Sequence, residues 1–78
     1  MTDPRFMRPG LDHAVDKVFE KCGELIAALG KTMRFGWDST DPVNTNNIET
    51  NAEWVRREMI DVVMAIQNLG NEMREKGF

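Results

Sequence analysis

The sequence predicts an all-α protein, a two-helix hairpin that assembles into a four-helix bundle by oligomerisation. Two long segments carry apolar residues at helical spacing, with one polar segment between them. The second segment is apolar on several sides, more than one partner helix can cover. A single domain of 78 residues buries only about 60% of its unfolded surface. We therefore expect a homodimer or homotetramer to complete the core.

The N-terminal half predicts an arm and a helix. Residues 1–10 hold two prolines and a glycine without apolar periodicity, which favours an extended arm before a single helical domain at 11–78. The first helix is expected at about 11–35, where Gly36 is placed to end it. Its apolar stripe comprises Leu11, Val15, Val18, Cys22, Leu25, Leu29 and Met33.

The C-terminal half predicts a loop and a second helix. Residues 36–51 are rich in Gly, Pro, Asp, Asn, Ser and Thr, which favour turns, so a loop is expected there. Thr50 and Glu53 have the spacing of a capping box, which predicts a helix at about 52–76. Its stripe comprises Val55, Met59, Val62, Ile66, Leu69 and Met73, while Ile60, Val63 and Met64 add apolar surface on other sides.

Composition excludes some function classes. A net charge of −3 gives no electrostatic basis for binding nucleic acid or an anionic membrane surface. The sequence has no apolar run of the length that a membrane span requires, and its apolar content of 41% is ordinary for a globular protein. With one cysteine and no signal-like segment, the expected location is the cytoplasm.

Two pairs of acidic residues lie within the predicted helices. Glu20 and Glu24 are four residues apart, and Glu58 and Asp61 are three apart, so each pair projects from one face of its helix. Two such faces brought together would gather four carboxylates. Hard oxygen ligands of this kind suit Mg²⁺ or Mn²⁺.

Simpler explanations of these acids remain open. Glu58 and Asp61 could form salt bridges with Arg56, Arg57 or a lysine of the first helix, and Glu20 and Glu24 could be solvated. Against solvation, small residues beside the glutamates leave room for another backbone or a ligand, and Lys31 projects on the face of Glu24. These small residues are Gly23, Ala27, Ala28 and Gly30.

The two acidic segments resemble a known family. Glu20-Lys-Cys-Gly-Glu24 with the following Lys-x-x-Arg-Phe-Gly, and later Glu58-Met-Ile-Asp61, are similar to motifs of short MazG-like nucleoside triphosphate pyrophosphohydrolases, especially those of phages and prophages. The resemblance covers about residues 12–70. It implies an all-α oligomer that uses Mg²⁺ to cleave a nucleoside triphosphate into a monophosphate and pyrophosphate.

The resemblance also implies roles for the acidic residues. Glu24, Glu58 and Asp61 match metal ligands, and Glu20 matches a fourth ligand or the group that positions water. Glu20 and Glu24 are therefore the expected catalytic residues. Lys21 stands where the family usually has a further glutamate, and its ammonium group would repel a cation.

The nucleotide is expected to be bound by three residues that follow the first motif. Lys31 and Arg34 could hold phosphate oxygens, although Arg34 could equally be a solvated charge near the helix end. Trp37 could stack on a base or anchor the loop. The alternative function is that of a catalytically impaired MazG-like protein of the phage-encoded type. It would bind a nucleotide or a protein partner without catalysis, because Lys21 neutralises the acidic cluster. A helical oligomer without a ligand is a third hypothesis.

Overall fold

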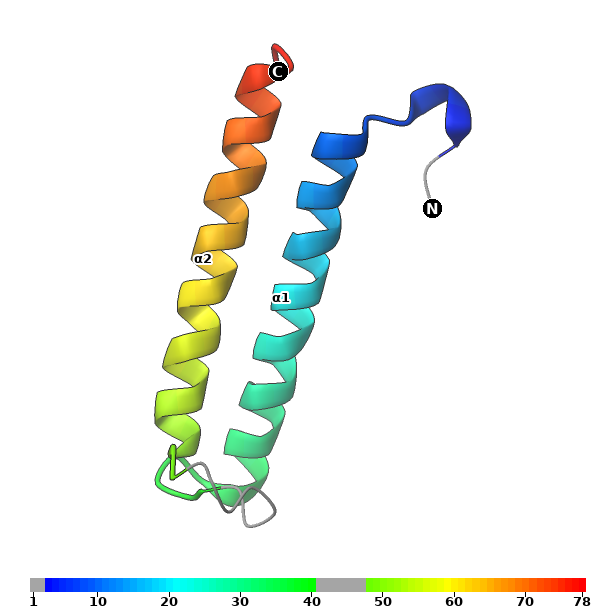
Figure 1. Ribbon diagram of the computed structural model, residues 1–78. Helices are drawn as coiled ribbons and strands as arrows, with labels where there is room; N and C mark the ends of the chain where they lie inside the picture. The colour runs from blue at the N-terminus through cyan, green and yellow to red at the C-terminus, as the bar shows by residue number, and fades with distance from the viewer. Residues whose placement is uncertain (1–2, 41–47) are drawn as a thin grey trace.

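A computed structural model describes residues 3–40 and 48–78 of the chain. Two long helices, α1 (Pro9–Phe35) and α2 (Asn51–Glu75), lie side by side in antiparallel directions, and a short 3₁₀ helix, η1 (Pro4–Phe6), precedes them (Figure 1). The hairpin measures 46 × 22 × 21 Å. Within the described residues the chain is helical apart from turns and one isolated bridge, Thr40 to Thr50, which confirms the predicted class.

Helix α1 begins two residues before its predicted start. Pro9 occupies the first turn, where a missing backbone N–H costs nothing, and the Arg8 N–H donates to Oδ2 of Asp12 at 3.0 Å. The predicted arm is therefore shorter, and it contains η1; residues 1 and 2 lie outside the described part. At the other end, Gly36 stops α1 with a φ of +96°, which confirms its predicted role.

Helix α2 starts with the predicted capping box. The Thr50 hydroxyl accepts from the backbone N–H of Glu53, and the Glu53 carboxylate accepts from the backbone N–H of Thr50. Buried Asn51 ties the two helices together, because its Nδ2 donates to the carbonyl of Gly36 at 2.8 Å. These contacts join both ends of the predicted loop, of which residues 41–47 lie outside the described part.

One row of residues on each helix faces the other helix. We call these rows the inner seam, and their members are seven residues apart in two interleaved series, so that they fall on one face of each helix. All of them are buried or half-buried. The inner seam comprises Leu11, Ala14, Val18, Lys21, Leu25, Ala28 and Thr32 of α1, and Asn51, Val55, Glu58, Val62, Ala65, Leu69 and Glu72 of α2.

A second apolar row follows one residue after the inner seam on each helix. Each residue is rotated by about 100° around the helix axis from the one before it. Because the two helices are antiparallel, residues that follow the inner seam by one position lie on the same side of the hairpin in both helices. We call this side the outer face. It comprises Val15, Phe19, Cys22, Ile26, Leu29 and Met33 of α1, and Met59, Val63, Ile66, Gly70 and Met73 of α2. Most of its large side chains are exposed, with Ile26 at 68% and Met33 at 80%.

The predicted stripes combined these two rows. Leu11, Val18 and Leu25 pack toward α2, whereas Val15, Cys22, Leu29 and Met33 belong to the outer face. On α2, Val55, Val62 and Leu69 lie in the inner seam, and Met59, Ile66 and Met73 lie on the outer face. An apolar stripe as wide as this exceeds what one neighbouring helix covers.

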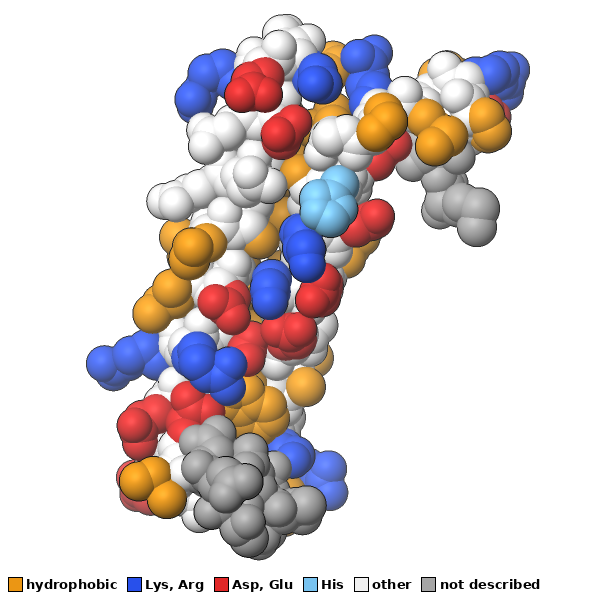
Figure 2. Space-filling view, viewed as in Figure 1, with side chains coloured by type: hydrophobic (Ala, Val, Ile, Leu, Met, Phe, Trp, Pro, Cys, Tyr) orange, Lys and Arg blue, Asp and Glu red, His pale blue; other side chains and the backbone are white. Residues whose placement is uncertain are grey.

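The side opposite the outer face is charged. Positions one residue before the inner seam hold Lys17, Glu20, Glu24 and Lys31 on α1, and Trp54, Arg57 and Asp61 on α2. Arg34 continues the same row at the end of α1. Figure 2 shows acidic and basic side chains gathered along the middle of this charged face. Among the described residues, no helix is both long enough and apolar enough to cross a membrane.

Candidate metal centre

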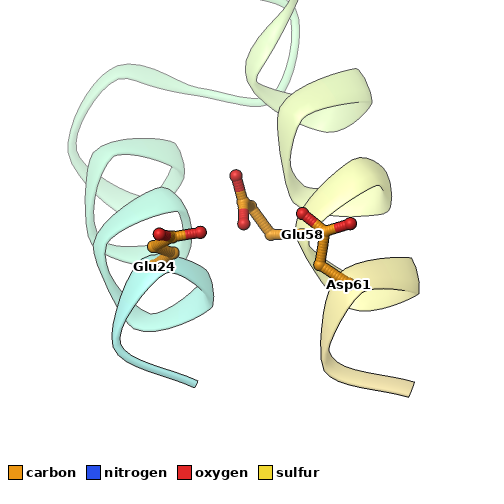
Figure 3. Close-up of side chains that lie close together, drawn as sticks. All are labelled: Glu24, Glu58 and Asp61. Carbon is orange, nitrogen blue, oxygen red and sulfur yellow. The ribbon is translucent and has the colours of Figure 1, made fainter. Parts of the chain in front are cut away.

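Three carboxylates meet where the inner seam borders the charged face. Glu24 extends from α1, and Glu58 and Asp61 extend from α2, so that the three side chains face the space between the helices (Figure 3). One oxygen from each lies within 4.8 Å of one oxygen from each of the others. This spacing lets three oxygens surround a small cation. We call the group the acidic centre.

Glu58 is the buried member of the acidic centre, at 4% exposure. Its Oε1 accepts from Nε1 of Trp54 at 3.2 Å and from Nη1 of Arg57 at 3.1 Å. Its Oε2 is buried and has no hydrogen-bond partner among the described residues. A buried polar atom without a partner carries a desolvation cost of about 1–3 kcal/mol or more. Binding of a cation would remove that cost, so the residues present fit a metal ion.

A lysine stands beside the acidic centre. Nζ of Lys21 lies 3.5 Å from Oε2 of Glu24, and both side chains are partly exposed. The negative charge of Glu24 raises the pKa of the Lys21 ammonium, and Asp61 and Glu20 add to this effect. Lys21 thus contacts the acidic centre from α1.

An arginine stands on the other side. Arg57 forms a two-point contact with Glu49, from Nε to Oε2 and from Nη2 to Oε1, both at 3.0 Å. The hydrogen bonds that Arg57 donates to Glu49 raise the pKa of Arg57, with smaller contributions from the charges of Glu49, Glu58 and Asp61. A salt bridge from Arg57 to Glu58, one of the simpler explanations for this acidic residue, is therefore present. It uses Oε1 of Glu58 and leaves Oε2 without a partner among the described residues.

Glu20, predicted as a catalytic residue and fourth ligand, lies outside the acidic centre. It is exposed, and its Oε2 lies 3.2 Å from Nζ of Lys17 in the same helix. Its position one turn before Glu24 keeps it on the charged face. The structure thus brings together three of the four predicted carboxylates.

The predicted nucleotide-binding residues have different surroundings. Nζ of Lys31 lies 5.6 Å from the ring centre of Trp54, the residue that donates to Glu58, so Lys31 borders the acidic centre. The guanidinium of Arg34 lies over the ring of Phe35 at 5.1 Å. Trp37 is exposed after the end of α1, where its carbonyl accepts from the N–H of Ala52.

Trp54 was not among the predicted site residues, and Arg57 was predicted only as one possible ion-pair partner of Glu58 and Asp61. Trp54 lies four residues before Glu58 and Arg57 one residue before it, so helical spacing would have placed the Trp54 indole beside Glu58.

A shallow hollow on the surface of α2 continues from Asp61, and two guanidinium groups line it. It is lined by Glu49, Ala52, Glu53, Arg56, Arg57, Ile60 and Asp61.

No protein-family model, curated protein or solved structure matches this chain.

Proposed function

We propose that this chain is a cytoplasmic enzyme that binds Mg²⁺ or Mn²⁺ through Glu24, Glu58 and Asp61 and hydrolyses a nucleoside triphosphate to a monophosphate and pyrophosphate. The carrying observation is the buried Oε2 of Glu58, which has no hydrogen-bond partner in the described part of the chain and lies within a group of three carboxylates. The reaction class rests on the resemblance of about residues 12–70 to MazG-like pyrophosphohydrolases. When bound, the cation would offset the charge of the triphosphate and orient its phosphates.

The carboxylates in and beside the acidic centre would have two different roles, binding the metal ion and positioning water. Glu24, Glu58 and Asp61 supply hard oxygen ligands from two helices. Glu20 is exposed one turn away, so we assign it to hold the attacking water and accept its proton. The water oxygen forms a bond to the phosphorus at one end of the α–β bridge, and the bond from that phosphorus to the bridging oxygen breaks. The monophosphate and pyrophosphate then separate.

Cations around the acidic centre would hold the remaining phosphate charge. Lys31 borders the centre through Trp54, and Arg56 and Arg57 line the hollow that continues from Asp61. Guanidinium groups present several N–H donors to phosphate oxygens. We retain Arg34 and Trp37 as contacts to the more distant part of the nucleotide, with Trp37 exposed enough to stack on a base.

We further propose that a second copy of the chain covers the outer face and completes a four-helix bundle. The chain exposes 6121 Å², whereas a compact monomer of 8.9 kDa exposes about 4,800 Å². The excess exceeds the roughly 800 Å² that each partner contributes to a standard interface. Both helices present their outer rows with the same seven-residue period, which suits packing against an identical pair.

This arrangement would leave the acidic centre accessible. The outer face and the charged face lie on opposite sides of the hairpin, so a partner on one does not cover the other. Each centre would then be complete within one chain. The assembly would be a homodimer, or a homotetramer if two such dimers associate.

A second candidate function is supported by Lys21. Its ammonium group lies 3.5 Å from Glu24 and offsets part of the negative charge that would attract a cation. In this case the protein would bind a nucleotide or a protein partner without hydrolysing it. Binding of a nucleotide without release of pyrophosphate would distinguish this function from the enzyme.

The test is an assay of pyrophosphate and monophosphate release. The purified protein would be incubated with Mg²⁺ or Mn²⁺ and a panel of ribo- and deoxyribonucleoside triphosphates, beside Glu58→Gln and the control Glu75→Gln. Glu75 is an exposed glutamate at the last position of α2, remote from the centre in sequence. We expect release that Glu58→Gln abolishes and Glu75→Gln preserves. No release from any nucleotide by the folded protein would refute the enzyme.

A further inference from the structure

Lys21 is the charged residue of the inner seam on α1. The other α1 members of the seam are apolar or, in Thr32, a hydroxyl that donates to the carbonyl of Ala28 within its own helix. The Lys21 side chain is 28% exposed, so its stem is partly covered while its ammonium group reaches Glu24. Its position thus directs a positive charge toward the acidic centre from the helix interface.

The charges of the site are unevenly matched. The carboxylates of Glu24, Glu58 and Asp61 are accompanied by two cations, Lys21 and Arg57, of which Arg57 is also paired with Glu49. These four carboxylates and two cations leave two net negative charges, which a divalent cation would neutralise. The ammonium group of Lys21 would then no longer be held by an excess of negative charge and would be available to an anion. The positive charge of Lys21 therefore opposes binding of the divalent cation and favours the later binding of an anion.

The contact of Lys21 is suited to release. It is a single contact at 3.5 Å between two partly exposed groups, and such ion pairs contribute little to stability. Arg57, in contrast, is held by two hydrogen bonds to Glu49 and a third to Glu58. Of the two cations, Lys21 has the flexible four-carbon stem and the weaker attachment, so Lys21 is the one that would move.

We infer that Lys21 is a resident cation of the acidic centre, which weakens divalent-ion binding and then contacts a phosphate oxygen of the ligand once the ion has bound. The inference rests on the proposed metal site and adds an order to its use, ion first and anion second. Because coupling between two binding equilibria is reciprocal, a phosphate anion would in turn strengthen ion binding.

The first experiment measures Mn²⁺ binding to the intact protein by the paramagnetic resonance of free Mn²⁺, in the wild type, Lys21→Met, Lys21→Arg and Lys17→Met. Lys17 is the matched control, because it pairs with Glu20 on the same helix outside the centre. Removal of one positive charge within several ångströms of a divalent ion is expected to strengthen binding about tenfold in Lys21→Met. Lys21→Arg and Lys17→Met should remain within about twofold of the wild type.

The second experiment measures binding of inorganic phosphate to the Mn²⁺-loaded proteins by titration calorimetry. Lys21→Met should bind phosphate several-fold more weakly than the wild type, and Lys21→Arg should retain its affinity. Opposite changes in the two affinities are a signature that a purely structural lysine would not produce. Circular dichroism of each variant establishes that the helices are intact, and Lys21→Gln offers a second uncharged variant.

The results separate this inference from the proposed function. Equal or weaker Mn²⁺ binding by Lys21→Met, with wild-type binding that Asp61→Asn abolishes, would overturn the role of Lys21 and leave the metal site standing. Unchanged phosphate binding would overturn the second half of the inference. Absence of Mn²⁺ binding in both the wild type and Lys21→Met would overturn the metal site and the inference together.

Discussion

The indole Nε1–H of Trp54 donates to Oε1 of Glu58 at 3.2 Å, which couples a fluorescent side chain to the buried carboxylate of the acidic centre. The two residues are four positions apart on α2, so their side chains are neighbours on one face of the helix, about one turn apart. Nζ of Lys31 lies over the Trp54 ring, 5.6 Å from its centre. A change of charge at Glu58 must therefore alter the surroundings of Trp54.

The first prediction uses this contact as a reporter. In a Trp37→Phe variant, Trp54 is the remaining tryptophan, and its emission should change in a saturable way with Mg²⁺ or Mn²⁺. The cation would draw electron density from the carboxylate that accepts the indole hydrogen bond. The matched variant Trp54→Phe, which retains Trp37 in the loop, should show little response. An equal response in both variants would count against binding at Glu58.

The second prediction concerns the cost of Glu58 in the inner seam. Glu58→Met should raise the free energy of unfolding by about 1 kcal/mol, because an apolar side chain replaces a buried carboxylate whose Oε2 has no described partner. Arg57 keeps its two hydrogen bonds to Glu49, so it is not left without a partner. Urea denaturation without divalent ions measures the change. Lower stability would mean that the bonds to Oε1 outweigh the cost at Oε2.

Local signals in the sequence were sufficient for the end of α1 and the start of α2. The capping box of Thr50 and Glu53 and the stop at Gly36 depend on contacts within a few residues, and both are present. The division of the apolar stripes was not predictable in the same way. Whether Leu25 or Leu29 faces α2 depends on the rotation of one helix against the other, which the period of the stripe does not determine.

The third prediction tests the two kinds of glycine. Gly36→Ala should lower stability by about 1–3 kcal/mol, because a φ of +96° with a ψ of 161° is a region that residues with a side chain avoid. Gly30→Ala should raise stability by about 0.5–1 kcal/mol, because this helical position has nothing within 4 Å of an added Cβ. Thermal unfolding followed by circular dichroism compares them. Similar effects of both substitutions would contradict the assigned conformations.

The fourth prediction concerns the outer face. Ile26→Glu and Met33→Glu should convert the expected dimer to a monomer at micromolar concentration, because each places a charge in the proposed interface. Phe6→Glu is the control, since Phe6 is similarly exposed, at 66%, but lies in η1 away from the outer face. Sedimentation equilibrium measures the mass. A wild-type monomer, or dimers that survive both outer-face changes, would refute this interface.

Part of the acidic centre followed from sequence spacing and part did not. Glu24, Glu58 and Asp61 meet as expected for two acidic helical motifs brought together. Glu20 was grouped with Glu24 because both project from one side of α1, yet the four-residue step separates them along the helix axis by about 6 Å. That distance is enough for Glu20 to pair with Lys17 instead. The place of Lys21 in the inner seam likewise depends on helix rotation.

The most direct measurement is an anomalous difference map from crystals of the protein soaked in MnCl₂. One peak per chain is expected among the carboxylates of Glu24, Glu58 and Asp61, about 2.0–2.2 Å from one oxygen of each. Lys21 Nζ should have moved away from Glu24. Crystals without a peak at this position, in which Lys21 still contacts Glu24 and Oε2 of Glu58 is met by a protein donor or water, would contradict the metal centre.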